Sequence, residues 1–402
     1  MSRADAAPSS GWSAVWARAT ASPTLMVVGA ALLARLLAIE VGGLAFLYLP
    51  HAWLQEVAGY QPPAGNFWFQ TLVGPWAHWD GYWYLSIAHL GYAGRPLAAA
   101  FFPLYPYLLR LLGDSVLLGL LLSVGCYTAG AVLLYRLTET ELSSGAAWGA
   151  VLALAFFPTA FYYNAVYPEA LVLLLTVASF WCARQRRYAW AGILAGLAGF
   201  ASLDALLLGI PLLYYLWTRR ERFARWLTLL LVPSGVLAYM GLLQWRFHNA
   251  LQFQTVQSYW GRALHAPWFT AAQAVIQFRH YLPLALSFWR LYNTQQPVVS
   301  LSNVWNLVFL AASIPLMVVA VRRLPAPYWL YSLGILLLPV VDPSAGVPLM
   351  SFPRLMLAAW PLFMGLGDWF SRRPGAIYAY LWIAGASGVV LISLFATAHW
   401  VA

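Results

Sequence analysis

The sequence predicts an all-α, polytopic integral membrane protein. Hydrophobic residues make up 62% of the 402 positions and charged residues 8%, against about 45–50% and about 25% in soluble domains. A span needs about 20 apolar residues, fewer inside a bundle. The apolar runs therefore predict about eleven transmembrane helices, near residues 24–49, 115–136, 146–162, 168–183, 188–202, 205–217, 226–245, 301–321, 327–341, 354–370 and 376–398.

Arginines between these runs predict which ends of the helices face the cytoplasm. The net charge is +10, but the arginines sit in short connectors and do not form one basic face, so nucleic-acid binding is not expected. The positive-inside rule makes their side cytoplasmic. These residues are Arg3, Arg18, Arg136, Arg184, Arg186, Arg187, Arg219, Arg220, Arg222, Arg225, Arg322, Arg323, Arg372 and Arg373.

The chain shows no internal repeat, so residues 1–402 are expected to form one integral domain. The N-terminus lacks a short apolar core followed by a small-residue cleavage site, so the first span is expected to be retained. Cys126 and Cys182 both fall in apolar runs, and no disulfide framework is indicated.

Two long loops, 50–114 and 246–300, are expected on the outer side. The first contains the polar and aromatic stretch 78–106. A helix over Trp79–His89 would place Asp80, Trp83, Tyr84 and Ile87 on one face. Pro103 and Pro106 then predict a turn in place of regular helix.

The second outer loop is basic. It carries Arg246, Arg262, Arg279 and Arg290, and no Asp or Glu occurs between Glu221 and Asp342. Such a surface favours an anion. The alternative is that these arginines only contact lipid head groups, because long loops escape the positive-inside rule.

Several motifs resemble those of the PIG-V type mannosyltransferases, the family of GPI mannosyltransferase 2 and its prokaryotic relatives, within the GT-C class. They occur in the family's order along most of the chain, and the first is the most specific. They are Trp79-Asp80 with Tyr84, Ile87-Ala88 and Gly91-Tyr92; Phe101-Phe102-Pro103-Leu104-Tyr105-Pro106; Pro158 with Tyr167-Pro168-Glu169; Gln257 with Trp260-Gly261-Arg262; and Ser351-Phe352-Pro353-Arg354.

This resemblance implies a GT-C fold in a prokaryotic plasma membrane, with an extracytoplasmic active site. It implies transfer of mannose, with inversion, from a polyprenyl or dolichyl phosphate donor to a glycolipid, polysaccharide or protein acceptor. Asp80 matches the family's catalytic aspartate. The chain departs from the family pattern at Leu203-Asp204 and at His248-Asn249, which leaves donor contacts and acceptor choice open.

The chemistry of such a transfer fits one carboxylate and a cationic clamp. Asp80 would take the proton of the attacking hydroxyl. A phosphate leaves readily, so a second acid is not required as in glycoside hydrolysis. Arg354 and Arg262 are expected to bind the donor phosphate, since a guanidinium holds phosphate bidentately. The expected substrate-binding or supporting residues are Trp79, Tyr84, Tyr105, Glu169 and Trp260.

Each assignment has a structural alternative. Asp80 would then only cap a helix, Glu169 would stabilise a helix N-terminus, and Arg354 would be an interfacial residue. No cofactor or metal is expected, because the histidines lack metal-ligand spacing and no acidic DxD-like pair is evident. Arg35 and Glu40 lie inside the first apolar run and are expected to find partners on neighbouring helices.

Three functions remain at this stage. A lipid-linked mannosyltransferase is the leading hypothesis. A transporter or flippase for a lipid-linked or anionic solute also explains charges inside a polytopic bundle, although matched repeats typical of transporters are not seen. The third hypothesis is a structural subunit of an envelope-assembly complex.

Overall fold

The computed structural model of this membrane protein describes residues 22–52, 60, 65–287, 290 and 299–402. Helices are the regular elements of this part of the chain, and it contains no strand. Arg3 and Arg18 lie outside the described residues. Five helical segments are long and apolar enough to cross a membrane: Pro23–Tyr48, Val116–Glu141, Phe223–Phe247, Val299–Arg323 and Pro374–Ala396.

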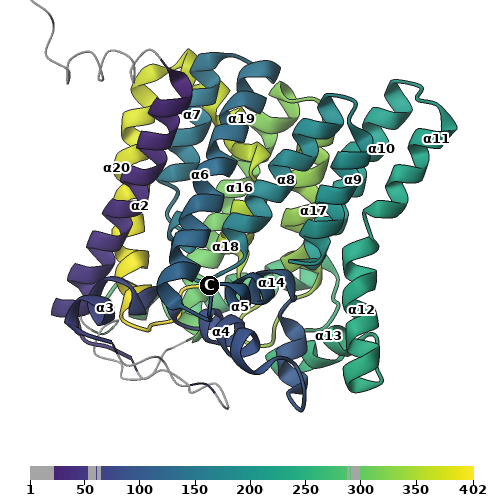
Figure 1. The fold of residues 1–402 in the computed structure, drawn as a ribbon. Helices are drawn as coiled ribbons and strands as arrows, with labels where there is room; N and C mark the ends of the chain where they lie inside the picture. Colours follow the sequence, from purple (N-terminus) through teal and green to yellow (C-terminus); the bar gives the residue numbers. More distant parts are fainter. Residues whose placement is uncertain (1–21, 53–59, 61–64, 288–289, 291–298) are drawn as a thin grey trace, which may run out of the picture.

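Every apolar run that was expected to span contains a helix, although several helices are shorter than the run (Figure 1). Helices of this length depend on their neighbours, because they are too short to cross about 30 Å of hydrocarbon alone. The bundle helices are α2 (Pro23–Tyr48), α6 (Val116–Glu141), α7 (Ser144–Ala155), α8 (Glu169–Arg184), α9 (Tyr188–Gly199), α10 (Gly209–Thr218), α12 (Ser234–Phe247), α16 (Ser302–Arg323), α17 (Ala326–Val341), α19 (Pro361–Arg372) and α20 (Pro374–Ala396).

Three expected helices were wrong in their extent. The run 146–162 is helical only as far as Ala155, and turns and a 3-10 helix, η3 (Ala160–Tyr163), follow. The run 354–370 divides into α18 (Phe352–Ala358) and α19, and the run 226–245 is interrupted before α12. Pro158, Pro233 and Pro361 lie at or beside these breaks, where the missing N–H of proline cannot continue a helix.

The buried Arg35 of α2 stabilises the break after α7. Its guanidinium donates to the carbonyl oxygens of Ala155, at 2.6 Å, and of Ala160, and to Asn164 Oδ1 at 3.0 Å. Carbonyls at a helix end have no intrahelical donor, and lipid supplies none. The expected partners of Arg35 are therefore confirmed, whereas Glu40 is exposed and has no partner among the described residues.

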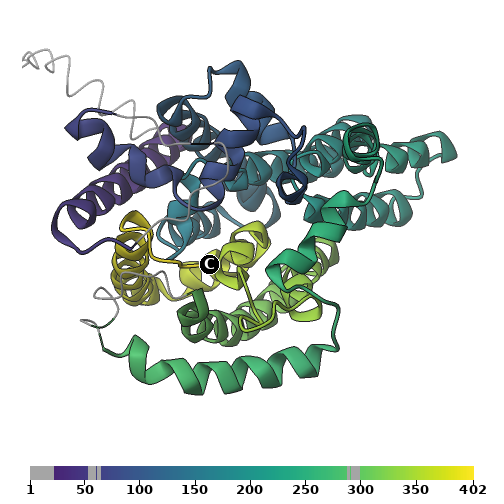
Figure 2. The same ribbon diagram turned by 90° about the horizontal axis from the view of Figure 1, so that it is seen from below.

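The helices of the two long loops gather at one end of the bundle (Figure 1). The opposite end carries the connectors that contain most of the arginines. In Figure 2, which views the loop end from below, the long loop helix α14 (Pro267–Ala285) lies lengthwise along one edge of the bundle. The loop helices are α3 (Phe67–Leu72), α4 (Asp80–Leu90), α5 (Leu104–Leu111), α13 (Gln252–Thr255) and α14 (Pro267–Ala285).

One helix in the first loop was predicted correctly and another was missed. Helix α4 nearly coincides with the expected Trp79–His89 segment. The prediction that Pro106 prevents regular helix was wrong, because α5 begins at Leu104 and contains it. Pro106 lies in the first helical turn, where the N–H groups have no intrahelical acceptor and a proline loses no hydrogen bond.

Helix α19 packs tightly against α7 through glycines. A Cβ added to Gly149 would lie 2.8 Å from Gly367 Cα, and one added to Gly367 would lie 2.2 Å from the Ala146 carbonyl oxygen. Small residues let helix backbones approach closely in membranes. The contact restricts how α19 can slide along α7. Because α18 directly precedes α19 in the chain, the contact also helps to position α18, which carries Arg354.

Candidate functional site

Asp80 occupies the first turn of α4 and follows an unusual backbone conformation. The preceding residue, Trp79, has φ of 60°, a region that non-glycine residues rarely adopt. The hydroxyl of Tyr167 accepts from the Asp80 N–H at 3.0 Å and donates to the His78 carbonyl oxygen at 2.9 Å. One buried tyrosine thus holds the backbone on both sides of Trp79 and fixes where α4 begins.

His78 anchors this segment to the last helix of the chain. Its Nδ1 lies 3.0 Å from the carbonyl oxygen of Phe395 in α20. Burial lowers the pKa of His78 to about 4, although the bond to the Phe395 carbonyl opposes this shift. The ring is therefore neutral near pH 7, with Nδ1–H as the donor, and it adds no positive charge beside Asp80.

Arg354 joins two carboxylates that are far apart in the sequence. Its Nη1 lies 2.5 Å from Asp80 Oδ2, and its Nε donates to Glu169 Oε1. The guanidinium also lies over the ring of Tyr167, with 5.0 Å from Cζ to the ring centroid. Ion-pair and cation–π contacts both strengthen away from water. Three separate segments thus meet at one arginine.

The two carboxylates differ in how exposed their second oxygen is, the one that Arg354 does not contact. No described residue hydrogen-bonds Asp80 Oδ1, and the side chain is 20% exposed. Glu169 Oε2 is enclosed and has no hydrogen-bond partner among the described residues. An exposed oxygen can accept a proton from a bound hydroxyl. An enclosed, unsatisfied oxygen is costly unless a ligand or water donates to it.

Arg262 lies in the second loop, close enough to interact electrostatically with Asp80 and Arg354. Its Nη1 is 3.7 Å from Asp342 Oδ2, and its side chain is 21% exposed. Burial lowers the pKa of Arg262, while Asp342 and Asp80 oppose that shift and Arg354 adds to it. Among the described residues, Asp342 is the carboxylate paired with Arg262, at a distance too long for a hydrogen bond.

A tight turn holds Arg262 in place. Gly261 has φ of 65°, and a Cβ there would lie 3.1 Å from the Ala345 Cβ. The Gly261 carbonyl oxygen accepts from the Ala345 N–H at 2.9 Å. The Ser344 hydroxyl donates to the Trp260 carbonyl oxygen. Glycine is needed at 261 for both conformation and space, and the turn ties Arg262 to the 342–347 segment.

Aromatic rings connect α4 with the Arg262 turn. Phe101 stacks on Trp83 at 5.2 Å between centroids and makes edge contacts with Tyr84 at 5.3 Å and with Trp260 at 6.1 Å. Tyr84 also contacts Tyr105 at 5.6 Å. Ring pairs with this geometry stabilise a folded structure beyond simple burial. The cluster therefore keeps the Asp80 helix and the Arg262 turn in a fixed relation.

The predicted site residues occupy three different situations. Asp80, Glu169 and Arg354 contact one another directly. Tyr84, Tyr105 and Trp260 belong to the aromatic cluster, and the Tyr105 hydroxyl is engaged with Ser123 Oγ at 2.9 Å. Two further residues make other contacts: Trp79 packs against Trp400, and Arg262 pairs with Asp342.

Tyr167 was not among the predicted site residues. It belongs to the Tyr167-Pro168-Glu169 motif, but nothing in that motif indicates that its hydroxyl bridges His78 and Asp80. Phe395 was also missed, because it lies in an apolar run with no distinguishing pattern. Within the described residues, no three His, Cys, Asp or Glu side chains are grouped as a metal site requires.

Comparisons with family models, curated proteins and solved structures found no match to this chain. The arrangement of Asp80, Glu169 and Arg354 therefore has to be interpreted from its own geometry, and the family resemblance stays a prediction.

Proposed function

We propose that this protein is a glycosyltransferase that moves mannose from a polyprenyl phosphate donor to a hydroxyl of an extracytoplasmic acceptor. The observation that carries the proposal is Asp80: Arg354 holds one carboxylate oxygen, no described residue hydrogen-bonds the other, and the side chain is 20% exposed. This is the arrangement that a general base requires: a fixed orientation and an open acceptor atom.

The reaction needs little more than this base. The acceptor oxygen forms a bond to C1 of the sugar, and its proton passes to Asp80 Oδ1. The bond between C1 and the phosphate oxygen breaks on the opposite face, so the configuration inverts. The bond's electron pair leaves with the polyprenyl phosphate, which is a good leaving group, and no second carboxylic acid is needed.

Arg262 is the better candidate for holding the donor phosphate. Its ionic partner within the described part of the chain, Asp342, is 3.7 Å away, so the Arg262 N–H groups are available to a phosphate in bidentate geometry. The Nε and Nη1 nitrogens of Arg354 already donate to Glu169 and Asp80, respectively. Phosphate binding by Arg354 stays a prediction, and the geometry favours a positioning role in which it orients Asp80.

Glu169 and the aromatic cluster supply the remaining contacts in this proposal. The unsatisfied Glu169 Oε2 would accept from a hydroxyl of the sugar or the acceptor. Trp79, Tyr84, Tyr105 and Trp260 would form or support the walls, as rings suit the apolar faces of a sugar. The acceptor class and the identity of the hexose are not specified by these contacts.

The proposal can be tested with the full chain in liposomes. Labelled polyprenyl phosphomannose is supplied together with total glycolipid or polysaccharide acceptors, and the products are separated by chromatography. We expect donor-dependent mannosylated product. A transporter or flippase would move the donor between leaflets and leave its glycosyl bond intact. Donor movement without product would therefore contradict the proposal.

A detergent control separates the two functions further. In micelles there are no leaflets, so transport cannot be detected, whereas a glycosyltransferase still forms product. Product formation by the purified chain in micelles would also exclude the purely structural role, because such a subunit would require the rest of its complex.

A further inference from the structure

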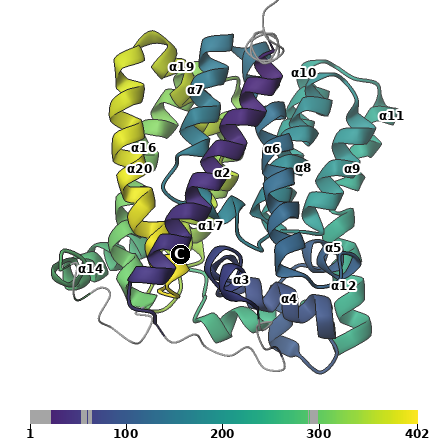
Figure 3. The same ribbon diagram turned by 60° about the vertical axis from the view of Figure 1, so that its left-hand side comes forward.

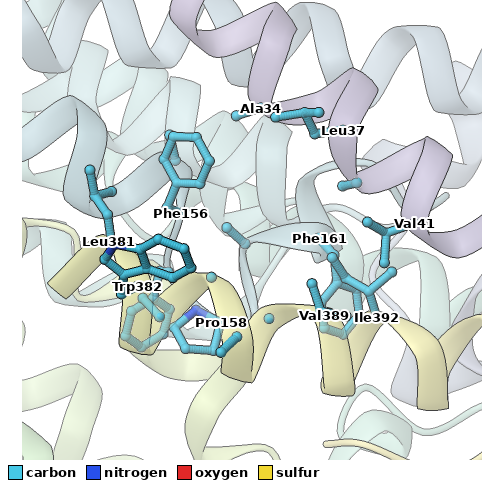
Figure 4. Close-up of a pocket in the computed structure, with 18 of the residues that line it drawn as sticks. Ala34, Leu37, Val41, Phe156, Pro158, Phe161, Leu381, Trp382, Val389 and Ile392 are labelled. Atoms are coloured by element: carbon cyan, nitrogen blue, oxygen red, sulfur yellow. The ribbon is translucent and has the colours of Figure 1, made fainter. Parts of the chain in front are cut away.

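The segment between α7 and α8 is buried although it is not an α-helix. This α7–α8 segment covers residues 156–168, and every position from 157 to 168 is buried. Connecting segments normally run over the surface, and irregular backbone at membrane depth is tolerated where protein encloses it. Figure 4 shows Phe156, Pro158 and Phe161 of the segment beside α2 and α20, the two helices that run side by side in Figure 3. The segment is therefore an internal element of the bundle.

Arg35 of α2 holds one side of the α7–α8 segment. Its guanidinium donates to Ala155, Ala160 and Asn164. In return, Asn164 Nδ2 donates to the Arg35 carbonyl oxygen at 2.9 Å. The guanidinium also lies over the Tyr127 ring, 4.7 Å from its centroid. A charge buried in a span is costly, and these hydrogen bonds all serve to fix the end of α7 and the segment that follows it.

The other side of the α7–α8 segment is bonded to α18. The Thr159 hydroxyl donates to the Pro353 carbonyl oxygen at 2.9 Å. The Tyr163 hydroxyl donates to the Leu357 carbonyl oxygen at 3.3 Å. These carbonyls lie about one turn apart in α18, with Arg354 between them in the sequence. Because α18 has only seven residues, it is too short to be stable alone, and its orientation depends on contacts such as these.

A third side chain of the segment contacts Arg354 itself. Tyr162 lies beneath the guanidinium, with 5.6 Å from Cζ to the ring centroid. The Tyr162 ring also packs on Tyr167 at 5.3 Å between centroids, and the Tyr167 hydroxyl fixes the start of α4. The segment that Arg35 holds therefore contacts both the arginine and the tyrosine that position Asp80.

We propose that Arg35 is a positioning residue for the site around Asp80. By fixing the α7–α8 segment, it fixes the hydroxyls of Thr159 and Tyr163. These hold α18 in the orientation in which Arg354 contacts the Asp80 carboxylate. The consequence for catalysis rests on the proposed function. The contacts themselves do not, so the link can be measured without any substrate.

The test measures how well Arg354 is protected from phenylglyoxal, a reagent that modifies accessible guanidinium groups that are not held in ion pairs. The full chain in micelles is modified for increasing times and analysed by peptide mass spectrometry. The Arg354 side chain is 17% exposed. Arg372 in α19, whose side chain is 56% exposed, is the internal reference for the activity of the reagent.

Two variants weaken the proposed link at different points. Arg35→Lys keeps the charge but replaces the planar fork with a single ammonium. The double variant Thr159→Val/Tyr163→Phe removes only the two hydroxyls that reach α18 and leaves the hydrogen bonds of Arg35 intact. Thr159→Ser is the conservative counterpart, because it keeps a hydroxyl at this position. Folding of each variant is checked by equilibrium unfolding in the same micelles.

A matched control removes the same kinds of hydroxyl away from α18. Ser179→Ala/Tyr380→Phe loses one small hydroxyl and one tyrosine hydroxyl, which donate to the carbonyl oxygens of Ala191 at 2.9 Å and Ala153 at 2.7 Å. A role limited to stability would lower the free energy of unfolding and leave the modification of Arg354 in the folded protein unchanged.

We expect Arg35→Lys and Thr159→Val/Tyr163→Phe each to raise the rate of Arg354 modification, relative to Arg372, about tenfold, equivalent to about 1.4 kcal/mol. The control variant and Thr159→Ser should match wild type. Wild-type protection of Arg354 in either folded variant, or an equal rise in the control, would overturn the proposal. If Arg35→Lys does not fold, the double variant decides the outcome. Because neither sugar donor nor acceptor is present, a failure to transfer mannose would contradict the proposed function and leave this result unaffected.

Discussion

Two ion-pair clusters lie at opposite ends of the α18–α19 segment, and they have inverse composition. In the first, Arg354 is shared by the two acids Asp80 and Glu169, and the three side chains are 13–20% exposed. In the second, Asp368 is shared by Arg323 and Arg372, which are 44% and 56% exposed. The first cluster carries one formal negative charge and the second one formal positive charge.

This difference suggests different roles: the first cluster is suited to catalysis, and the second to fixing the orientation of the helices in the membrane. Exposed arginines around one acid contribute little to stability, because water screens them, but they keep a connector on the cytoplasmic side in our interpretation. Two acids around one partly buried arginine leave Glu169 Oε2 without a hydrogen-bond partner among the residues that the structure describes. Such under-satisfied groups are expensive and are typical of sites that await a ligand.

The largest expected effect distinguishes the two arginines by stability. Arg354→Met leaves two partly buried carboxylates unpaired and should lower the free energy of unfolding by about 3–5 kcal/mol. Arg372→Met removes an exposed partner and should cost less than about 1 kcal/mol. Equilibrium unfolding in mixed detergent micelles measures both. Equal losses of unfolding free energy in the two variants would contradict the proposed difference between the clusters.

A double substitution sharpens the comparison. If the loss in Arg354→Met comes from unpaired charge, adding Glu169→Gln should restore most of it, since an amide costs less to bury than a carboxylate. The same unfolding measurement applies. A further loss in the double variant would indicate that Glu169 stabilises the fold independently of Arg354.

The next effect concerns the hydroxyl that fixes Asp80. Tyr167→Phe keeps the ring under Arg354 but removes the bonds to Asp80 N–H and His78 O. We expect about 2 kcal/mol of lost positioning, seen as a fall of more than about tenfold in kcat with little change in KM. A changed KM with normal kcat would instead assign Tyr167 to substrate binding.

The smallest expected effect is a pH dependence from His78. Its folded pKa, lowered to about 4 by burial, lies below the ordinary value of about 6.5. Between these values the unfolded chain binds a proton that the folded chain does not, so stability falls as the pH falls. The loss between pH 7 and pH 6 should be about 0.7 kcal/mol. It should disappear in His78→Gln, and a slope that persists in that variant would locate the titration elsewhere.

Sequence reasoning predicted the elements that depend on local pattern. Apolar runs marked the bundle helices, and the spacing of Asp80, Trp83, Tyr84 and Ile87 marked α4. The break after α7 was missed because its residues are as apolar as a span. Its backbone is satisfied by Arg35, more than 100 positions away in the sequence.

The site shows the same division between local and long-range information. Asp80, Glu169 and Arg354 were each identified from their own motifs, but their mutual contact depends on how α4, α8 and α18 meet. Arg354 was therefore predicted as a phosphate ligand, since its carboxylate partners could not be known from sequence separations of 274 and 185 residues.

Transfer of labelled mannose by matched amide variants tests the central proposal most directly. Asp80→Asn and Asp368→Asn each remove one carboxylate charge, one from each cluster, and folding is checked by unfolding in the same micelles. We predict that Asp80→Asn lowers the rate of transfer about 1,000-fold, as loss of a general base does, while folded Asp368→Asn stays within about threefold of wild type, because a charge this far from the reacting atoms is screened. Wild-type transfer by folded Asp80→Asn would contradict the account.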